Sequence, residues 1–298
     1  MTPQHTSFSP FRIWTIAAGT VTQLVRMRIL WALAILSLLV MGLGFAFPSV
    51  LGPEQQLKQL KEWSFSAIQI FFVIFSIAAT SLLLPRDVED RTLYTILCKP
   101  VPRHEYLIGK LLGMLLLVGA GMLVMDIVVC GVVGVKSAAV LAEMDNSLKV
   151  RNMVSASELE TNRQIVQQYG LTWNMHGAVW SAFLNSAVIC ALTLLISCFA
   201  TSTLFTILTS AACVVAGVGE PLARDFFLHG RFTHVVEKIL SLILAMLCPD
   251  LSAFNLVGPA VRGEVITTDA LLHVTGLAAL YLVGYTAVAY LFFAEKEL

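Results

Sequence analysis

The chain has 298 residues, of which 57% are hydrophobic and only 13% are charged, and its mean hydropathy is +0.82. This composition excludes an ordinary soluble domain, and a formal net charge of zero gives no overall field that would favour nucleic acid as a partner. The six cysteines include no Cys-x-x-Cys pair, so the sequence predicts neither a disulfide framework nor a metal site.

The first predicted element is an amphipathic helix over 11–28. Arg12 and Arg26 alternate there with Trp14 and aliphatic residues, a pattern typical of a helix that lies in the headgroup zone of a membrane. The apolar run that follows is too long for a signal peptide and is not followed by a small-x-small cleavage site. We therefore expect it to be retained as a membrane span, reached from the amphipathic helix through an elbow.

Uncharged runs long enough to cross the roughly 30 Å hydrocarbon layer predict six transmembrane helices. The run 177–219 carries no charge over its 43 residues and would make a helix about twice as long as a bilayer is thick, so it must fold back near Ser197–Thr203. Apart from Asp126 in the third, the spans contain no charged residue. The predicted spans are 29–47, 63–84, 111–135, 177–197, 203–219 and 270–294.

The connections between the spans predict the orientation. With the N-terminus inside, the inside segments carry nine Lys and Arg residues in 59, and the outside segments carry ten in 106. Because basic residues concentrate on the cytoplasmic side, we expect both termini to be cytoplasmic. The outside segments are then 48–62, 136–176, with a helical pattern over 157–169, and 220–269. Within the latter, 235–247 is predicted as a re-entrant or surface helix, or as a tilted seventh span.

A dense polar segment, 85–110, separates the second and third predicted spans and carries five basic and four acidic residues. We expect Pro85 to end the second span, because proline has no N–H for the helix ladder. A short helix is predicted from Asp87, with acids at its start, where the helix dipole favours them, and an apolar face that includes Leu93 and Leu97. On this basis alone, a docking element for a partner and a solvated loop are equally consistent with the pattern.

The residue order of this segment resembles the loop after the second span in permeases of the ABC-2 type. The matching residues are Glu89, Asp90, Arg91, Thr92, Leu93, Leu97, Pro100, Arg103, Gly109 and Lys110, and many relatives carry Gly at the position of Arg91. The amphipathic first helix, the six spans and the string Cys248–Asn255 before the last span resemble the same group. Within it, the chain is most similar to bacterial permeases of the nitrous-oxide-reductase-maturation and sodium-efflux types.

The resemblance implies an all-α polytopic membrane protein that serves as the permease subunit of an ATP-binding-cassette exporter in the bacterial inner membrane. It implies no catalytic residue and no cofactor on this chain, because a separate cytoplasmic ATPase subunit would bind ATP and Mg²⁺. A second permease chain, identical or not, would complete the pathway. The residues implied to dock the ATPase are Asp87, Glu89, Asp90, Arg91, Thr92, Leu93, Tyr94 and Leu97.

The chain has no phosphate-binding loop of its own. The nearest string, Gly131–Ser137, has the wrong spacing and ends an apolar run. This pattern agrees with an external ATPase.

Asp126 is the carboxylate inside a predicted span, where a charge costs about 3 kcal/mol on insertion scales. It is predicted to line a substrate pathway or to be hydrogen-bonded to a neighbouring helix, and the second, structural role is favoured. Two other functions stay open. A secondary transporter usually shows inverted repeats and several midplane charges, and an intramembrane enzyme needs clustered His, Asp or Glu; the sequence shows neither pattern.

Overall fold

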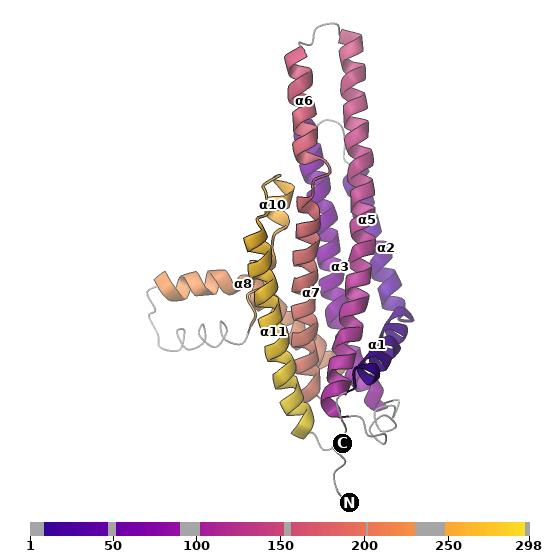
Figure 1. The fold of residues 1–298 in the computed structure, drawn as a ribbon, viewed down its shortest axis with the longest axis vertical. Coiled ribbons are helices and arrows are strands. Elements are labelled where there is room, and N and C mark those ends of the chain that lie inside the picture. The colour runs from indigo at the N-terminus through magenta and orange to yellow at the C-terminus, as the bar shows by residue number, and fades with distance from the viewer. Residues whose placement is uncertain are drawn as a thin grey trace, which may run out of the picture.

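The computed structural model describes residues 9–46, 52–89, 102–151, 156–200, 202–229 and 248–295. Within these ranges the chain forms helices and no strand, which confirms the predicted all-α fold class. The helices form an elongated bundle (Figure 1). They are α1 (Pro10–Val25), α2 (Arg28–Ala46), α3 (Pro53–Glu89), α5 (Arg103–Arg151), α6 (Ala156–Tyr169), α7 (Asn174–Phe199), α8 (Thr203–His229), α10 (Val257–Val261) and α11 (Thr268–Glu295), with a 3-10 turn, η1, at Ser252–Phe254.

Helix α7 is the centre of the bundle. Its residues from Ser181 to Cys198 are buried on almost every side, and it packs against α3, α5, α8 and α11. Many of these residues are Ala, Ser, Cys or Thr, whose small side chains let membrane helices approach closely. Helix α11 differs, because Leu272, Leu280 and Val283 are each 70% exposed. Such an apolar outer face is stable against lipid chains, which are as apolar as leucine.

Within the described residues, four helical segments are long and apolar enough to cross a membrane, and a bent pair would make a fifth. The four are Glu54–Leu83, Arg103–Met144, Arg163–Phe199 and Thr268–Ala294. The fifth predicted span, Thr203–Gly219, is helical but shorter than these. At about 1.5 Å per residue it measures roughly 26 Å, at the short end of the lengths that cross the hydrocarbon layer, and α8 continues beyond it to His229. The structure thus supplies four or five of the six predicted spans by length.

The bent pair joins α1 to α2. The segments Pro10–Val25 and Leu30–Gly42 meet at an angle of 62°, which is the elbow predicted between the amphipathic helix and the first span. One face of α1 is buried against α5, through Ile13, Ala17, Thr20 and Leu24. These residues recur every three or four positions, as one helix face requires. The amphipathic helix is confirmed, and its place in the headgroup zone stays a prediction.

Helix α5 is much longer than the third predicted span. Its 49 residues make a rod of about 73 Å, more than twice the hydrocarbon thickness. Its C-terminal part runs beside α6, and the two project beyond the rest of the bundle (Figure 1). Leu57, Val140 and Val166 form a small buried cluster between α3, α5 and α6. The helix predicted over 157–169 is confirmed as α6.

The expected helix end at Pro85 is wrong, because α3 remains helical to Glu89. A proline removes one hydrogen bond from the ladder but does not have to end the helix. The apolar stretch itself ends at Leu84, directly before Pro85, so the predicted end of the second span holds for composition and not for backbone. Asp87 therefore lies near the end of α3 and does not open a separate helix. The predicted element 235–247 lies outside the described residues.

Helix α8 contains Pro221, and its C-terminal part leaves the bundle sideways (Figure 1). The described chain resumes at Cys248, and the residues that follow lie between α8 and α11. The backbone N–H of Asp250 donates to the hydroxyl of Tyr281 at 3.2 Å. Its Oδ1 accepts the N–H groups of Ser252 and Ala253, both at 3.2 Å, at the start of η1. The string Cys248–Asn255 thus has a structural role, because its backbone is hydrogen-bonded to both α8 and α11.

Candidate functional site

An ion pair joins the start of α1 to the start of α5. Nε of Arg12 donates to Oε2 of Glu105 at 2.8 Å, and its Nη2 donates to Oε1 at 3.0 Å. The backbone N–H of Ser9 also donates to Oε1, at 3.0 Å. The Glu105 side chain is fully buried, whereas that of Arg12 is 28% exposed. Because both carboxylate oxygens are engaged by one guanidinium, the pair fixes orientation as well as distance.

A second connection ties the start of α5 to the end of α11. Nη1 of Arg103 donates to the carbonyl oxygens of Phe293 at 3.0 Å and of Ala294 at 2.7 Å. Carbonyls in the last turn of a helix have no intrahelical donor, and the helix dipole favours a cation beside them. Tyr106 stacks on Phe293 with ring centroids 5.9 Å apart. We call this end of the bundle, formed by Ser9, Arg103 and Ala294, the base.

Glycines bring α1 and α5 into backbone contact at the base. A Cβ added at Gly109 would lie 2.8 Å from Cβ of Ile16, and one at Gly113 would lie 2.7 Å from the carbonyl oxygen of Ala17. Next to this crossing, Nζ of Lys110 donates to Oε1 of Gln23 at 3.3 Å. Arg103, Gly109 and Lys110, three residues of the motif that carried the resemblance, therefore all hold α5 against its neighbours.

The structure describes the predicted ATPase-docking set only at its edge. Asp87 and Glu89 lie in the last turns of α3. The remaining residues, Asp90, Arg91, Thr92, Leu93, Tyr94 and Leu97, lie outside the described residues. The two helices on either side of the undescribed residues, α3 and α5, pack against each other, and α5 is held at the base by the contacts above. The docking role of these residues stays a prediction.

Asp126 is hydrogen-bonded to the central helix. Its Oδ2 lies 2.7 Å from Nδ1 of His176 in the first turns of α7. One turn further along α5, Sγ of Cys130 donates to Oδ1 of Asp126 at 3.9 Å. The predicted hydrogen bond to a neighbouring helix is thus present, and a role in a substrate pathway stays a prediction.

A cavity of about 440 Å³ opens beside this pair, between α5 and α7. Asp126 and His176 provide its polar side, and Met122, Trp180 and Phe183 are among its apolar lining residues. The ring of Trp173 stands edge-on to that of His176, with centroids 5.1 Å apart. Tryptophans are typical of the membrane–water interface, which suggests that the cavity lies near that level.

Reasoning from the sequence missed His176 and Cys130 as partners of Asp126. Cys130 was within reach, because residues four apart share one face of a helix. His176 lies 50 residues from Asp126 along the chain, beyond α6, and no local pattern connects the two. Only the packing of α7 against α5 brings the imidazole to the carboxylate.

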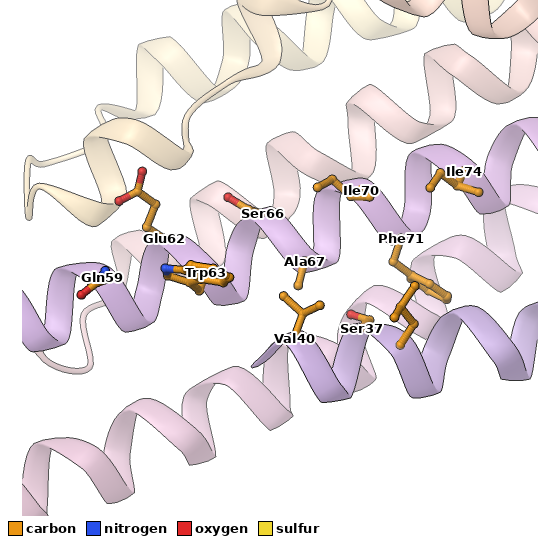
Figure 2. A pocket seen from close by; sticks show the side chains of 11 residues that line it. Ser37, Val40, Gln59, Glu62, Trp63, Ser66, Ala67, Ile70, Phe71 and Ile74 are labelled. Atoms are coloured by element: carbon orange, nitrogen blue, oxygen red, sulfur yellow. The ribbon is translucent and has the colours of Figure 1, made fainter. Parts of the chain in front are cut away.

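A second hollow, an apolar groove of about 460 Å³, runs between α2 and α3. Figure 2 shows Gln59 and Glu62 at one end of it and Ile70 and Ile74 towards the other, with Val40 of α2 facing Ala67 across it. The groove combines a polar end with an apolar length. Leu36, Ile70 and Ile74 of its lining are exposed, whereas Ser37, Ala67 and Phe71 are buried.

Comparison with known proteins assigns the family. The family described as ABC-2 family transporter protein matches residues 14–298, which include most of α1 and every later helix that the structure describes. A search of curated proteins found no match. Proteins of this family are membrane-spanning transport components and generally pair with a cytoplasmic ATPase. The fold agrees, with an all-helical bundle of several apolar spans. The chain therefore belongs to the ABC-2 transporter family and is a multi-pass membrane protein.

Proposed function

We propose that this chain is the permease subunit of an ABC exporter and that a separate cytoplasmic ATPase drives it through the segment 85–110. The observation that carries the proposal is the set of contacts at the base. Arg103 and Glu105 lie in the C-terminal part of the segment, at the start of α5, and bind α11 and α1. A displacement of the segment would therefore be transmitted to three helices together and not to α5 alone.

The physical argument rests on stiffness. Buried, bidentate charge pairs and backbone-to-backbone helix contacts have one preferred geometry, so they transmit a movement without absorbing it. The Arg12–Glu105 pair and the glycine crossing of α1 and α5 are contacts of this kind. Leu93 and Tyr94 would then supply the apolar anchors in a cleft of the ATPase, with Glu89, Asp90 and Arg91 in polar contacts around them.

The same proposal sets the membrane orientation and the assembly. The distribution of basic residues supports a base, with both termini, on the cytoplasmic side of a bacterial inner membrane. ATP and Mg²⁺ would be bound by the ATPase, since the sequence carries no phosphate-binding loop. A second permease chain, identical or related, would complete the pathway.

Co-purification tests the proposal. The chain is co-expressed with the ATPase encoded beside it, and the complex is isolated through a tag on the ATPase. The double variant Leu93→Asp/Tyr94→Asp should lose the complex while it still inserts into the membrane. Val265, an apolar residue 80% exposed between α10 and α11, provides the control, and Val265→Asp should keep the complex. Unchanged complex formation in the double variant would contradict the docking role. No complex with the wild-type chain would contradict the proposed function.

A further inference from the structure

We propose that Asp126, Cys130 and His176 form a binding site for a divalent transition-metal ion, with Zn²⁺ as the best match. The three side chains offer one oxygen, one sulfur and one nitrogen atom, and these atoms all lie within 4.8 Å of one another. The site stands apart from the base and from the 85–110 segment, so it does not depend on the proposed docking of an ATPase.

The donor set selects the class of ion. Ca²⁺ and Mg²⁺ prefer oxygen ligands throughout, whereas thiolate and imidazole together favour Zn²⁺ and its neighbours. Tetrahedral bonds of about 2.0–2.3 Å place donor atoms about 3.5 Å apart. Nδ1 of His176 lies 2.7 Å from Oδ2 of Asp126, and Sγ of Cys130 lies 3.9 Å from the other carboxylate oxygen, Oδ1, so these separations lie on either side of that value. Small side-chain rotations are therefore enough to close the site around an ion.

The helices position the three donors before any ion arrives. Asp126 and Cys130 are four residues apart on α5, so their side chains share one face. His176 lies in the first turn of α7, which is anchored because Nδ2 of Asn174 donates to the carbonyl oxygen of Glu264 at 2.9 Å. A site on packed helices holds its ligands more closely than a site on a loop.

The cavity beside the site provides access. The His176 side chain is 43% exposed and that of Asp126 is 12% exposed, so the imidazole faces the opening and the carboxylate lies deeper. Structural zinc sites are closed by four protein ligands, whereas three leave one position open. Here the open position would be filled by water, or by the thioether of Met122, which also lines the cavity. An open position allows the ion to exchange.

The competing explanation is a plain hydrogen bond between Asp126 and His176 that only packs α5 against α7. In that explanation Cys130 is only a thiol that donates to Asp126, and it is never a thiolate ligand. The test therefore reads the thiolate directly. The full-length chain in lipid nanodiscs is titrated with Co²⁺, whose visible spectrum reports tetrahedral coordination and cobalt–thiolate bonding, and Zn²⁺ is then added as a competitor.

We expect a thiolate-to-cobalt band that Zn²⁺ removes and that Cys130→Ser abolishes. Asp126→Asn and His176→Gln should each weaken Co²⁺ binding about tenfold or more. Cys213, a half-buried thiol on α8, is the matched control, and Cys213→Ser should leave the band unchanged. The absence of the band in the wild-type chain, or a band that survives Cys130→Ser, would overturn the proposal.

A second measurement needs no variant and so does not depend on variant folding. Maleimide labelling of the wild-type chain is followed peptide by peptide with mass spectrometry. Zn²⁺ should slow the labelling of Cys130 several-fold and leave the labelling of Cys213 unchanged. Mg²⁺ added in place of Zn²⁺ should change neither rate. Equal labelling rates for Cys130 with and without Zn²⁺ would contradict the site.

Discussion

The backbone N–H of Leu251 donates a hydrogen bond to the carbonyl oxygen of Gly217 at 3.2 Å. In a regular helix that carbonyl would accept from the residue four positions later. In α8 that residue is Pro221, which has no N–H. The segment before α11 therefore supplies the donor that the proline lacks, and this hydrogen bond attaches that segment to α8.

Gly217 makes this attachment possible, because a Cβ there would lie 2.5 Å from the carbonyl oxygen of Pro249. We predict that Gly217→Ala lowers the free energy of unfolding by about 1–3 kcal/mol, the cost typical of overpacking. Gly219→Ala is the control, since no atom lies within 4 Å of its added Cβ. Apparent melting temperatures in detergent compare the two. Equal temperatures for both variants would count against the close contact.

A similar comparison tests the crossing of α1 and α5. Gly113→Ala places a Cβ 2.7 Å from the carbonyl oxygen of Ala17, a backbone atom that cannot move aside cheaply. We expect a loss of about 1–3 kcal/mol and a faster proteolytic release of α1. Gly131→Ala, on the same helix with no atom within 4 Å, should behave as wild type. If α1 is released at the same rate in both, the crossing does not hold it.

The Arg12–Glu105 pair should be needed for stability at the base. Arg12→Ala leaves the buried carboxylate without its guanidinium, and breaking a fully buried pair costs about 3–5 kcal/mol. Because Arg12 is 28% exposed, we expect somewhat less, on the order of 2–3 kcal/mol. The charge swap Arg12→Glu/Glu105→Arg should recover part of the loss. Arg262→Ala, which breaks an exposed pair with Glu264, should leave the melting temperature unchanged. A swap no better than the single variant would argue against a specific pair.

Replacing Lys61 with an apolar residue should increase the stability of the fold. Its side chain is fully buried in α3, and among the described residues no hydrogen-bond partner of its Nζ is found. An uncompensated buried ammonium opposes folding, so Lys61→Met, which keeps the length of the side chain, should raise the free energy of unfolding by about 1–4 kcal/mol.

Lys58 provides the comparison one turn away. Its Nζ pairs with Glu54 at 2.5 Å and lies 4.4 Å from the centre of the Tyr169 ring. Lys58→Met should therefore bring no gain in melting temperature. A lower melting temperature for Lys61→Met than for the wild-type chain would mean that Lys61 has a partner that stabilises the fold.

The hydropathy of the sequence was sufficient to predict most of the candidate spans. The long apolar runs behind α3, α5, α7 and α11 were predicted from composition alone, because a helix that crosses lipid must satisfy its backbone internally and needs about twenty apolar residues. The turn near Ser197–Thr203 and the elbow between α1 and α2 are confirmed for the same reason, since both are visible as interruptions in an apolar pattern.

Helix ends were less predictable. Composition cannot tell where a helix stops when it continues into water, so α5 proved to be far longer than its span. Pro85 was expected to end a helix that continues to Glu89, because one lost hydrogen bond does not outweigh the rest of the ladder. The apolar run 203–219 is helical within α8 but shorter than the four candidate spans, so its crossing of the membrane stays a prediction.

The sequence by itself determined that this is a helical membrane protein with a charged segment between two spans, and the motif of that segment identified the ABC-2 family that the comparison confirms. Only the tertiary structure decided which residues meet. Arg12 pairs with Glu105, 93 residues away in the sequence, and Asp126 contacts His176, 50 residues away. The backbone N–H of Leu251 donates to the carbonyl oxygen of Gly217. Hydropathy is a local property that sets each span separately, whereas these contacts depend on the order and rotation of packed helices, which no local pattern contains.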